Sequence, residues 1–167
     1  MTELDHIWSK MLDEAASKAG NTGREHVAEY LRLRATNDVM RSAGVEWLFD
    51  TVIEIAGRAV RDLHGITMER QEPHNFPHGN SNMVGSRLEI RLGVRCLTVE
   101  AGWARTPADG IMRNGALAFA RITHFGMPKN GADLRLIHTE NLPNWLADTG
   151  AIVNSHELRR HFEVFLG

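Results

Sequence analysis

Cysteine is almost absent from this sequence, since Cys96 is the only one in 167 residues. A single thiol excludes an internal disulfide and any zinc site built from two or more cysteines. The chain also lacks a run of about 20 apolar residues, the length that a membrane-spanning helix needs. Its first residues, MTELDHIWSK, carry acids where a signal peptide has a basic start and an apolar stretch. We therefore expect a soluble, cytoplasmic protein.

An excess of charge of one sign is missing as well. Lys and Arg total 19 against 21 Asp and Glu, which gives a formal net charge of −2. This balance disfavours a strongly basic nucleic-acid binder and a polyacidic tail. Apolar residues make up 43% of the chain, enough for a sizeable core. Repeats and low-complexity runs are not found, so we predict a single domain over residues 1–167.

The first third of the chain has the pattern of helices. Apolar residues recur at intervals of three and four, which predicts three helices, over 2–20, from 22 onward, and over 36–64. The sequence TGRE, from Thr22 to Glu25, has the form of a capping box at the start of the second helix. Gly44 is expected to divide the third helix into a short and a long piece.

After Gly65 the apolar period changes from 3.6 to 2, which is typical of strands. Strands are predicted over 66–72, 87–96, 96–103, 116–126 and 132–140, with two short pieces at 144–147 and 151–153. In 87–96 the alternation places Leu88, Ile90 and Cys96 on one inward face and Arg87 and Arg91 on the other. The phase shift that follows marks a bulge or sharp bend near Gly93.

Together these elements predict an α+β fold. It has three N-terminal helices (1–64), a β-rich part (65–153) with a mostly antiparallel sheet of about five strands, and one C-terminal helix (154–167). Strands and helices do not alternate along the chain, which argues against a doubly wound parallel sheet.

The tripeptide Asp148-Thr149-Gly150 is the one that carries the catalytic carboxylate of aspartic proteases. That chemistry needs two carboxylates that share one proton. The motif occurs once here, and only 17 residues follow it, too few for the flap and strand that follow it in retrovirus-like proteases. Asp and Gly also favour turns between short strands. We therefore expect a turn at Asp148 and not a protease site.

The segment EPHNFPHGNSN, residues 72–82, is expected to be the longest polar loop. His74 and His78 are four residues apart, but the neighbouring prolines exclude the helix that would align two metal ligands. The loop is a candidate for ligand binding by hydrogen bonds. A divalent metal would need a third ligand, such as Glu100. His124 and His138 form no chelate in either plausible strand register.

Six arginines lie between positions 87 and 121, with few acids to offset them: Arg87, Arg91, Arg95, Arg105, Arg113 and Arg121. Outward guanidinium groups suit an anionic ligand or a nucleic-acid backbone. Few aromatic residues are available for base stacking, which disfavours nucleic acid. A sheet face covered by Arg–Glu pairs is the other interpretation of the same pattern.

The sequence favours a soluble, non-catalytic domain that binds a ligand or partner, with His74, His78, Arg87 and Arg91 as the candidate binding residues. No catalytic residue, metal ligand or cofactor is assigned. Two alternatives stay open: a hydrolase-like enzyme that uses His74, His78 and Glu100, with or without a metal, and nucleic-acid binding through the arginine face. A small anionic ligand or a protein is the expected partner, no membrane contact is expected, and a homodimer is left open.

Overall fold

The computed structural model describes residues 3–140 and 142–167. Two helices, α1 (Glu3–Asn21) and α2 (Glu25–Val60), precede the sheet, and α3 (Ser155–Leu166) follows it. The strands are β1 (Ile66–His78), β2 (Ser81–Leu92), β3 (Arg95–Trp103), β4 (Ala118–His124), β5 (Ala132–His138) and β6 (Pro143–Ala147). The predicted α+β class and C-terminal helix are confirmed. None of the described helices is long and apolar enough to cross a membrane.

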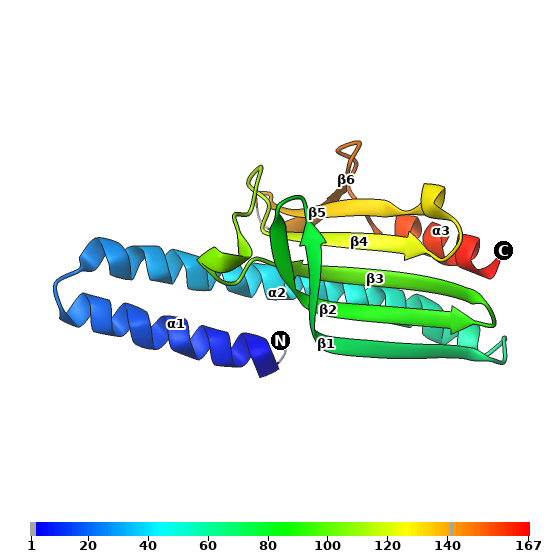
Figure 1. Cartoon of the computed structure of the whole chain (residues 1–167), viewed down its shortest axis with the longest axis horizontal. Helices are drawn as coiled ribbons and strands as arrows, with labels where there is room; N and C mark the ends of the chain where they lie inside the picture. The colour runs from blue at the N-terminus through cyan, green and yellow to red at the C-terminus, as the bar shows by residue number, and fades with distance from the viewer. Residues whose placement is uncertain (1–2, 141) are drawn as a thin grey trace.

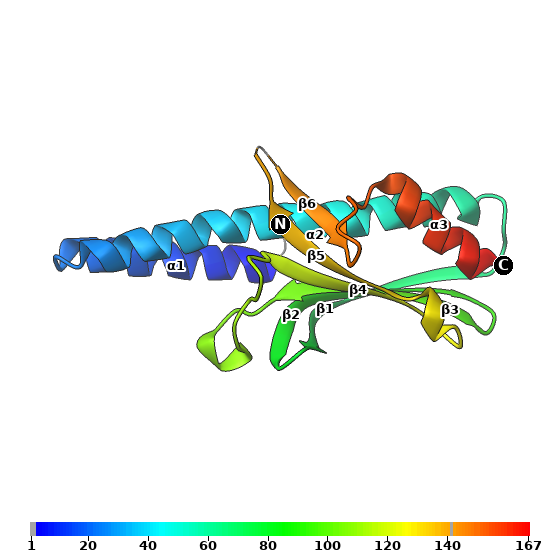
Figure 2. The ribbon, with the colours of Figure 1, turned by 90° about the horizontal axis from the view of Figure 1, so that it is seen from above.

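The six strands form one antiparallel sheet in which each strand pairs with its sequence neighbour, in the order β1 to β6. Helices α2 and α3 lie on the same side of this sheet, as Figures 1 and 2 show. The first half of α2 runs beyond the sheet with α1 beside it and forms a two-helix arm (Figure 1). We call the side of the sheet that α2 and α3 leave open the front face.

The core lies between the sheet and the two covering helices. Leu88 and Ile90 of β2 are buried there against Leu48 and Phe49 of α2, which are fully buried. Their inward orientation agrees with the predicted alternation. Removing such side chains from water contributes roughly 1.5–3 kcal/mol each, so this layer is the main source of stability.

A buried polar cluster fixes the arm to the sheet. Arg105, which follows β3, donates to the Asp5 carboxylate at 2.8 Å and lies 3.5 Å from the centre of the Trp103 ring. Trp8 of α1 donates its indole N–H to Asp38 of α2 at 2.7 Å. Arg105 was expected among the outward arginines, but the structure places it inside this cluster, since Asp5 provides its counter-charge.

The helix count differs from the prediction, because the predicted second and third helices form one continuous helix, α2. Gly44 does not break it. A side chain at this position would come within 2.5 Å of Leu136 on β5, so the glycine allows close packing of helix and sheet. The prediction of a capping box at Thr22 is also wrong, since the Thr22 hydroxyl donates to the Lys18 and Ala19 carbonyls at the end of α1.

The predicted polar loop at residues 72–82 is instead a hairpin. Strand β1 extends to His78, Gly79 and Asn80 form the turn, and β2 starts at Ser81. Prolines are tolerated here because β1 is an outer strand with no neighbour on one side. The register shifts between Gln71 and His74, around a cis peptide bond before Pro73.

The far end of this hairpin bends across the front face (Figures 1 and 2). Gly85 on β2 and Gly102 on β3 lie opposite each other at the bend. A Cβ atom on Gly85 would be 1.9 Å from the Ala101 carbonyl oxygen, so no other residue fits without moving the backbone. Beyond the bend, Phe76 and Met83 pack on Phe119 of β4 in a second small apolar cluster.

The predicted strand 87–96 is two strands, because Gly93 and Val94 form a turn between β2 and β3. Gly93 has a φ of 60°, which a turn of this kind requires. The turn restarts the alternation, so Cys96 pairs with Arg91 and lies on the front face, opposite to the face of Ile90. Its predicted burial is confirmed, since Cys96 is only 9% exposed, but its predicted face is wrong.

Both outer strands carry prolines. Pro73 and Pro77 lie on β1, and Pro143 begins β6. After β6 the chain turns back along its outer side, where the Val153 N–H donates to the Trp145 carbonyl at 2.8 Å. This return segment, residues 148–154, leads directly into α3 and covers part of the outer edge of β6.

Candidate functional site

The predicted binding residue His74 contacts Glu100 on the front face. Its ring nitrogen Nε2 lies 2.7 Å from the Glu100 Oε1 atom, and both side chains are about one-sixth exposed, at 15% and 17%. The bend at Gly85 makes this contact possible, because it brings the end of β1 toward β3. Two of the three residues of the enzyme alternative are therefore in contact.

His78 takes no part in this contact. Its ring stacks on Phe119, with ring centres 3.7 Å apart, and the neighbouring Pro77 carbonyl accepts a hydrogen bond from Arg121. Burial lowers the pKa of His78, and the negative charge of Asp133 partly opposes that effect. Among the described residues, no three His, Cys, Asp or Glu side chains gather in a way that could hold a metal ion.

The predicted arginines Arg87 and Arg91 share one carboxylate, Glu89. Arg91 Nη2 lies 2.8 Å from Glu89 Oε2, and Arg87 binds the other oxygen. The hydrogen bond from Arg91 is the largest influence that holds the pKa of Glu89 below its ordinary value. The Arg87 Nε atom is buried and has no hydrogen-bond partner in the described chain.

Charges of opposite sign alternate across the strands of the front face. Arg87, Glu100, Arg121 and Asp133 are successive partners from β2 to β5, and Arg121 Nε lies 3.1 Å from Asp133 Oδ1. Arg95 lies outside this row and donates to the Leu166 carbonyl of α3. The front face is therefore a network of paired charges and not a continuous basic surface.

A histidine pair that the sequence analysis missed lies between β4 and α3. His124 Nε2 is 3.1 Å from His161 Nδ1, and His124 is only 4% exposed. Burial lowers the pKa of both rings, and the second ring lowers that of His124 further. The sequence spacing of 37 residues gave no sign of this contact.

Asp148 lies in a turn, as predicted. The turn follows β6, with the Gly150 N–H donating to the Ala147 carbonyl at 2.9 Å and Gly150 at a φ of 83°. The expected turn at this tripeptide is therefore confirmed.

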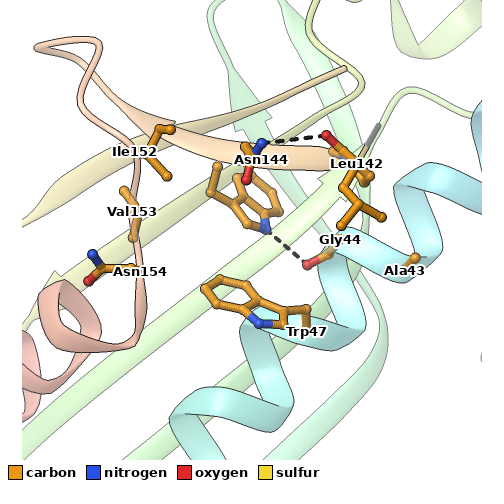
Figure 3. Close-up of a pocket in the computed structure, with 10 residues that line it drawn as sticks. Ala43, Gly44, Trp47, Leu142, Asn144, Ile152, Val153 and Asn154 are labelled. Atoms are coloured by element: carbon orange, nitrogen blue, oxygen red, sulfur yellow. Dashed lines mark hydrogen bonds between the residues drawn. The ribbon is translucent and has the colours of Figure 1, made fainter. Parts of the chain in front are cut away.

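A separate cavity of about 390 Å³ lies between α2 and β6 (Figure 3). It is lined by Ala43, Gly44, Trp47, Leu142, Pro143, Asn144, Trp145, Ile152, Val153 and Asn154. These residues come from α2, from β6 and its preceding loop, and from the return segment. None of them carries a charge.

The walls of this pocket are apolar and partly exposed to water. Trp145 is 2% exposed and donates its indole N–H to the Gly44 carbonyl at 2.9 Å, which fixes the floor against α2. Trp47 is 41% exposed, Ile152 56% and Leu142 70%. Apolar side chains that gather around a concavity and stay exposed are typical of binding sites.

Two asparagines supply polar groups at this pocket. Asn144 donates its side-chain N–H to the Thr139 hydroxyl at 2.6 Å. The Asn154 side-chain oxygen caps α3 by accepting from the backbone N–H groups of His156 and Glu157, at 2.9 and 3.1 Å. Both amides are thereby held in fixed orientations.

The sequence did contain one signal of this pocket. Trp47 lies outside the helical stripe of Val45, Leu48, Phe49 and Val52, so a large aromatic residue points away from the core.

The chain matches no protein-family model, no curated protein and no solved structure, so any function has to be inferred from its own geometry.

Proposed function

We propose that this protein is a non-catalytic domain that binds a small molecule in the pocket between α2 and β6. The observation that supports this function is a cavity of about 390 Å³ with three apolar lining side chains, Trp47, Leu142 and Ile152, that stay partly exposed. Ligand pockets usually enclose about 300–1,000 Å³ and combine apolar walls with a few polar groups.

The energetics are consistent with binding. Each Å² of apolar surface that an occupant removes from water contributes about 25 cal/mol. Part of that gain is offset by the translational and rotational freedom that the ligand loses, which costs about 4–15 kcal/mol. Contacts with the fixed polar groups are needed for tighter binding, so the chemistry of the ligand matters.

Binding without catalysis is the function that fits the composition of the pocket. Its described lining holds no carboxylate, imidazole, thiol, hydroxyl or ammonium side chain. General acid–base and nucleophilic catalysis both need such groups within hydrogen-bond reach of the substrate. A cytoplasmic location stays part of this proposal, and cell fractionation would test it.

The test uses a neutral reporter, N-phenyl-1-naphthylamine, whose fluorescence rises in an apolar site. Trp47→Ala should weaken its binding at least about 10-fold, because it removes the largest exposed wall. Val60→Ala is the matched control, since Val60 is also an exposed apolar residue of α2, at 37%, but lies at the C-terminal end of the helix and does not line this pocket. Equal binding by the Trp47 variant and the wild type would contradict the proposal.

A second candidate is the binding of a small anion on the front face by His74, His78, Arg87 and Arg91. The observation in its favour is the buried, unpaired Arg87 Nε atom, a donor that an anion could satisfy. Inorganic phosphate, titrated while the side-chain signals of Arg87 are followed by NMR, provides the test. A hydrolase-like reaction at His74 and Glu100 and nucleic-acid binding are weaker proposals, because the charges of this face are paired.

A further inference from the structure

We propose that a second cavity, between α2 and the segment of residues 104–112, binds a small organic anion with one acidic group on an apolar body. This cavity encloses about 410 Å³, and we call it the loop cavity. The inference goes beyond the proposed function, because the place on the molecule and the class of ligand are both different.

One wall of the loop cavity is a single face of α2. The residues of this helix that line it occupy positions 30, 33, 34, 37 and 41. Intervals of three and four residues place side chains on the same side of a helix. The helix therefore presents an aromatic ring, an aliphatic side chain and two guanidinium groups to one concavity.

The opposite wall is held in place by its own hydrogen bonds and packing. The Asp109 carboxylate accepts the backbone N–H groups of Arg105 and Thr106, at 3.1 and 3.0 Å. Gly110 packs so closely on the next element that a Cβ atom there would come within 2.4 Å of the Ser81 hydroxyl oxygen. A wall that is already ordered saves a ligand the entropic cost of ordering it.

Arg34 supplies a positive charge that an anion can neutralise. The charged residues of the described lining are both arginines, Arg34 and Arg41. The charge of Arg41 is offset by Asp38, whose Oδ1 atom lies 2.6 Å from Arg41 Nη1. Arg34 donates to the Arg105 carbonyl and lies 5.3 Å from the centre of the Trp8 ring, but among the described residues it has no acidic partner. A guanidinium group carries five N–H donors, so others remain for an acidic group.

Exposed apolar side chains complete the lining of the loop cavity. Tyr30 and Leu33 are each 61% exposed, and Ile111 on the opposite wall is 77% exposed. Apolar groups that gather around a concavity beside a few polar groups are typical of ligand sites. An apolar body covers these side chains, whereas a small inorganic anion leaves them in water, so the lining favours an organic acid.

The test compares two dyes that have the same apolar skeleton. The compound 1-anilinonaphthalene-8-sulfonate is N-phenyl-1-naphthylamine with one added sulfonate group. On the full chain we expect the sulfonate to bind in the loop cavity and the neutral dye to bind in the pocket between α2 and β6. Trp47→Ala should therefore weaken binding of the neutral dye and leave binding of the sulfonate nearly unchanged.

Ile111→Glu tests the position of the site without disturbing the core, because Ile111 is so exposed. The new carboxylate beside the cavity should weaken binding of the sulfonate roughly 3- to 10-fold through charge repulsion. Val94→Glu is the matched control, since Val94 is 88% exposed and lies in the turn at the other end of β3. The neutral dye should bind both variants as it binds the wild type.

Arg34→Gln tests the charge itself and should weaken binding of the sulfonate at least about 10-fold. Arg32→Gln is its control, because Arg32 is an exposed arginine of α2 outside the lining. Arg34→Lys keeps the charge but loses the planar fork, so its affinity should be intermediate. A purely structural role of Arg34 would lower the melting temperature of Arg34→Gln without this order of affinities.

Competition with the sulfonate on the wild type tests the ligand class. We expect 1-naphthoate to displace it, whereas 1-naphthamide, which is neutral, and inorganic phosphate, which has no apolar body, should each compete at least about 10-fold more weakly. Equal competition by either compound would overturn the inference.

Two other results would also overturn it: binding of the sulfonate by Ile111→Glu as tight as by Val94→Glu, or equal loss of both dyes in Trp47→Ala, which would place them in one pocket. If Arg34→Gln fails to fold, the Ile111 variant and the competition decide. Failure of the neutral dye alone would contradict the proposed function and leave this inference standing.

Discussion

The front face and the pocket beside β6 belong to the same sheet, yet their side chains differ in charge and in how fully they are paired or covered. On the front face almost every charge has an internal partner, as in the Arg91–Glu89 and Arg121–Asp133 pairs. The pocket carries no charge, and three of its apolar side chains, Trp47, Leu142 and Ile152, stay partly exposed to water.

This difference shows why charged residues in a sequence are a poor guide to binding. An exposed ion pair contributes only about 0–1 kcal/mol to stability, but each charged group in it already has a partner within the protein. Apolar side chains that stay exposed to water after folding have no internal partner of this kind. The contrast makes the uncovered pocket a better candidate site than the paired face. Of the four predictions below, three concern the front face and one concerns the buried histidine pair between β4 and α3.

The largest effect is expected from Gly85→Ala, which breaks the bend that brings His74 to Glu100. The added Cβ atom would meet the backbone oxygen of Ala101 at 1.9 Å, so the two strands must separate. The free energy of unfolding should fall by at least about 3 kcal/mol. Urea denaturation followed by circular dichroism measures this loss.

Gly57→Ala on α2 is the control, because a side chain there would meet nothing within 4 Å. It should stabilise the protein by about 0.5–1 kcal/mol, since alanine favours helix more than glycine does. If both variants have the stability of the wild type, the close approach of β2 and β3 at Gly85 is not needed for the bend of the hairpin across the front face.

The second effect is a loss of stability in acid, caused by His124 and His161. Burial lowers the pKa of both rings below the ordinary value of 6.5. Below that pH the unfolded chain binds protons that the folded chain does not, so the free energy of unfolding falls. It should be constant above about pH 7 and should fall as the pH drops from 6.5 toward 5.

His161→Gln should reduce this pH dependence, because it removes one of the two buried rings and the neighbour of the other. His6→Gln, at an exposed position of α1, is the matched control. His78 acts in the same direction, since burial also lowers its pKa, so a smaller dependence should persist. An identical pH profile for His161→Gln and the wild type would contradict the assignment.

A smaller effect is expected from replacing both Arg87 and Arg91 with Lys. The side chains are 35% and 57% exposed, so loss of their contacts with Glu89 should cost less than about 1 kcal/mol. Binding of the reporter in the β6 pocket should not change, whereas any phosphate binding on the front face should weaken. A melting temperature several degrees lower would show that these arginines are structural and would remove support for an anion site.

The smallest change concerns the reactivity of Cys96. Cys96 is 9% exposed, so labelling of the native protein should be at least about 100-fold slower than labelling in urea. Arg91→Ala should raise the native rate, because Arg91 is the cross-strand neighbour of Cys96 on the front face. Labelling by a thiol reagent, followed by absorbance, measures both rates, and rapid labelling of the wild type would show that this part of the front face opens readily.

Local patterns predicted most of the fold. The change of period at Gly65 located the start of the sheet, and the last helix was predicted over 154–167, where Asn154 caps α3. The hairpin at 72–82 was missed because its prolines suggest a loop, and only the position of β1 at the edge of the sheet makes them acceptable. The face of Cys96 was missed because one turn at Gly93 reverses the alternation.

The candidate sites were less predictable, because they depend on contacts between distant segments. His74 and Glu100 were both named, but their contact requires the bend at Gly85. The pocket joins α2, β6 and the return segment, and no local pattern relates Trp47 to residues about 100 positions later. Only the out-of-phase position of Trp47 on its helix pointed to it.

The prolines of the two outer strands affect whether the sheet of one molecule can pair with the sheet of another at high protein concentration. A sheet of six strands in sequence order has two open sides where another chain could add a strand and begin a fibre. Pro73, Pro77 and Pro143 each remove one backbone donor from those sides, and the return segment covers part of β6. These features disfavour the addition of a strand from another chain, and two of the prolines, Pro73 and Pro77, are the ones that suggested a loop in the sequence.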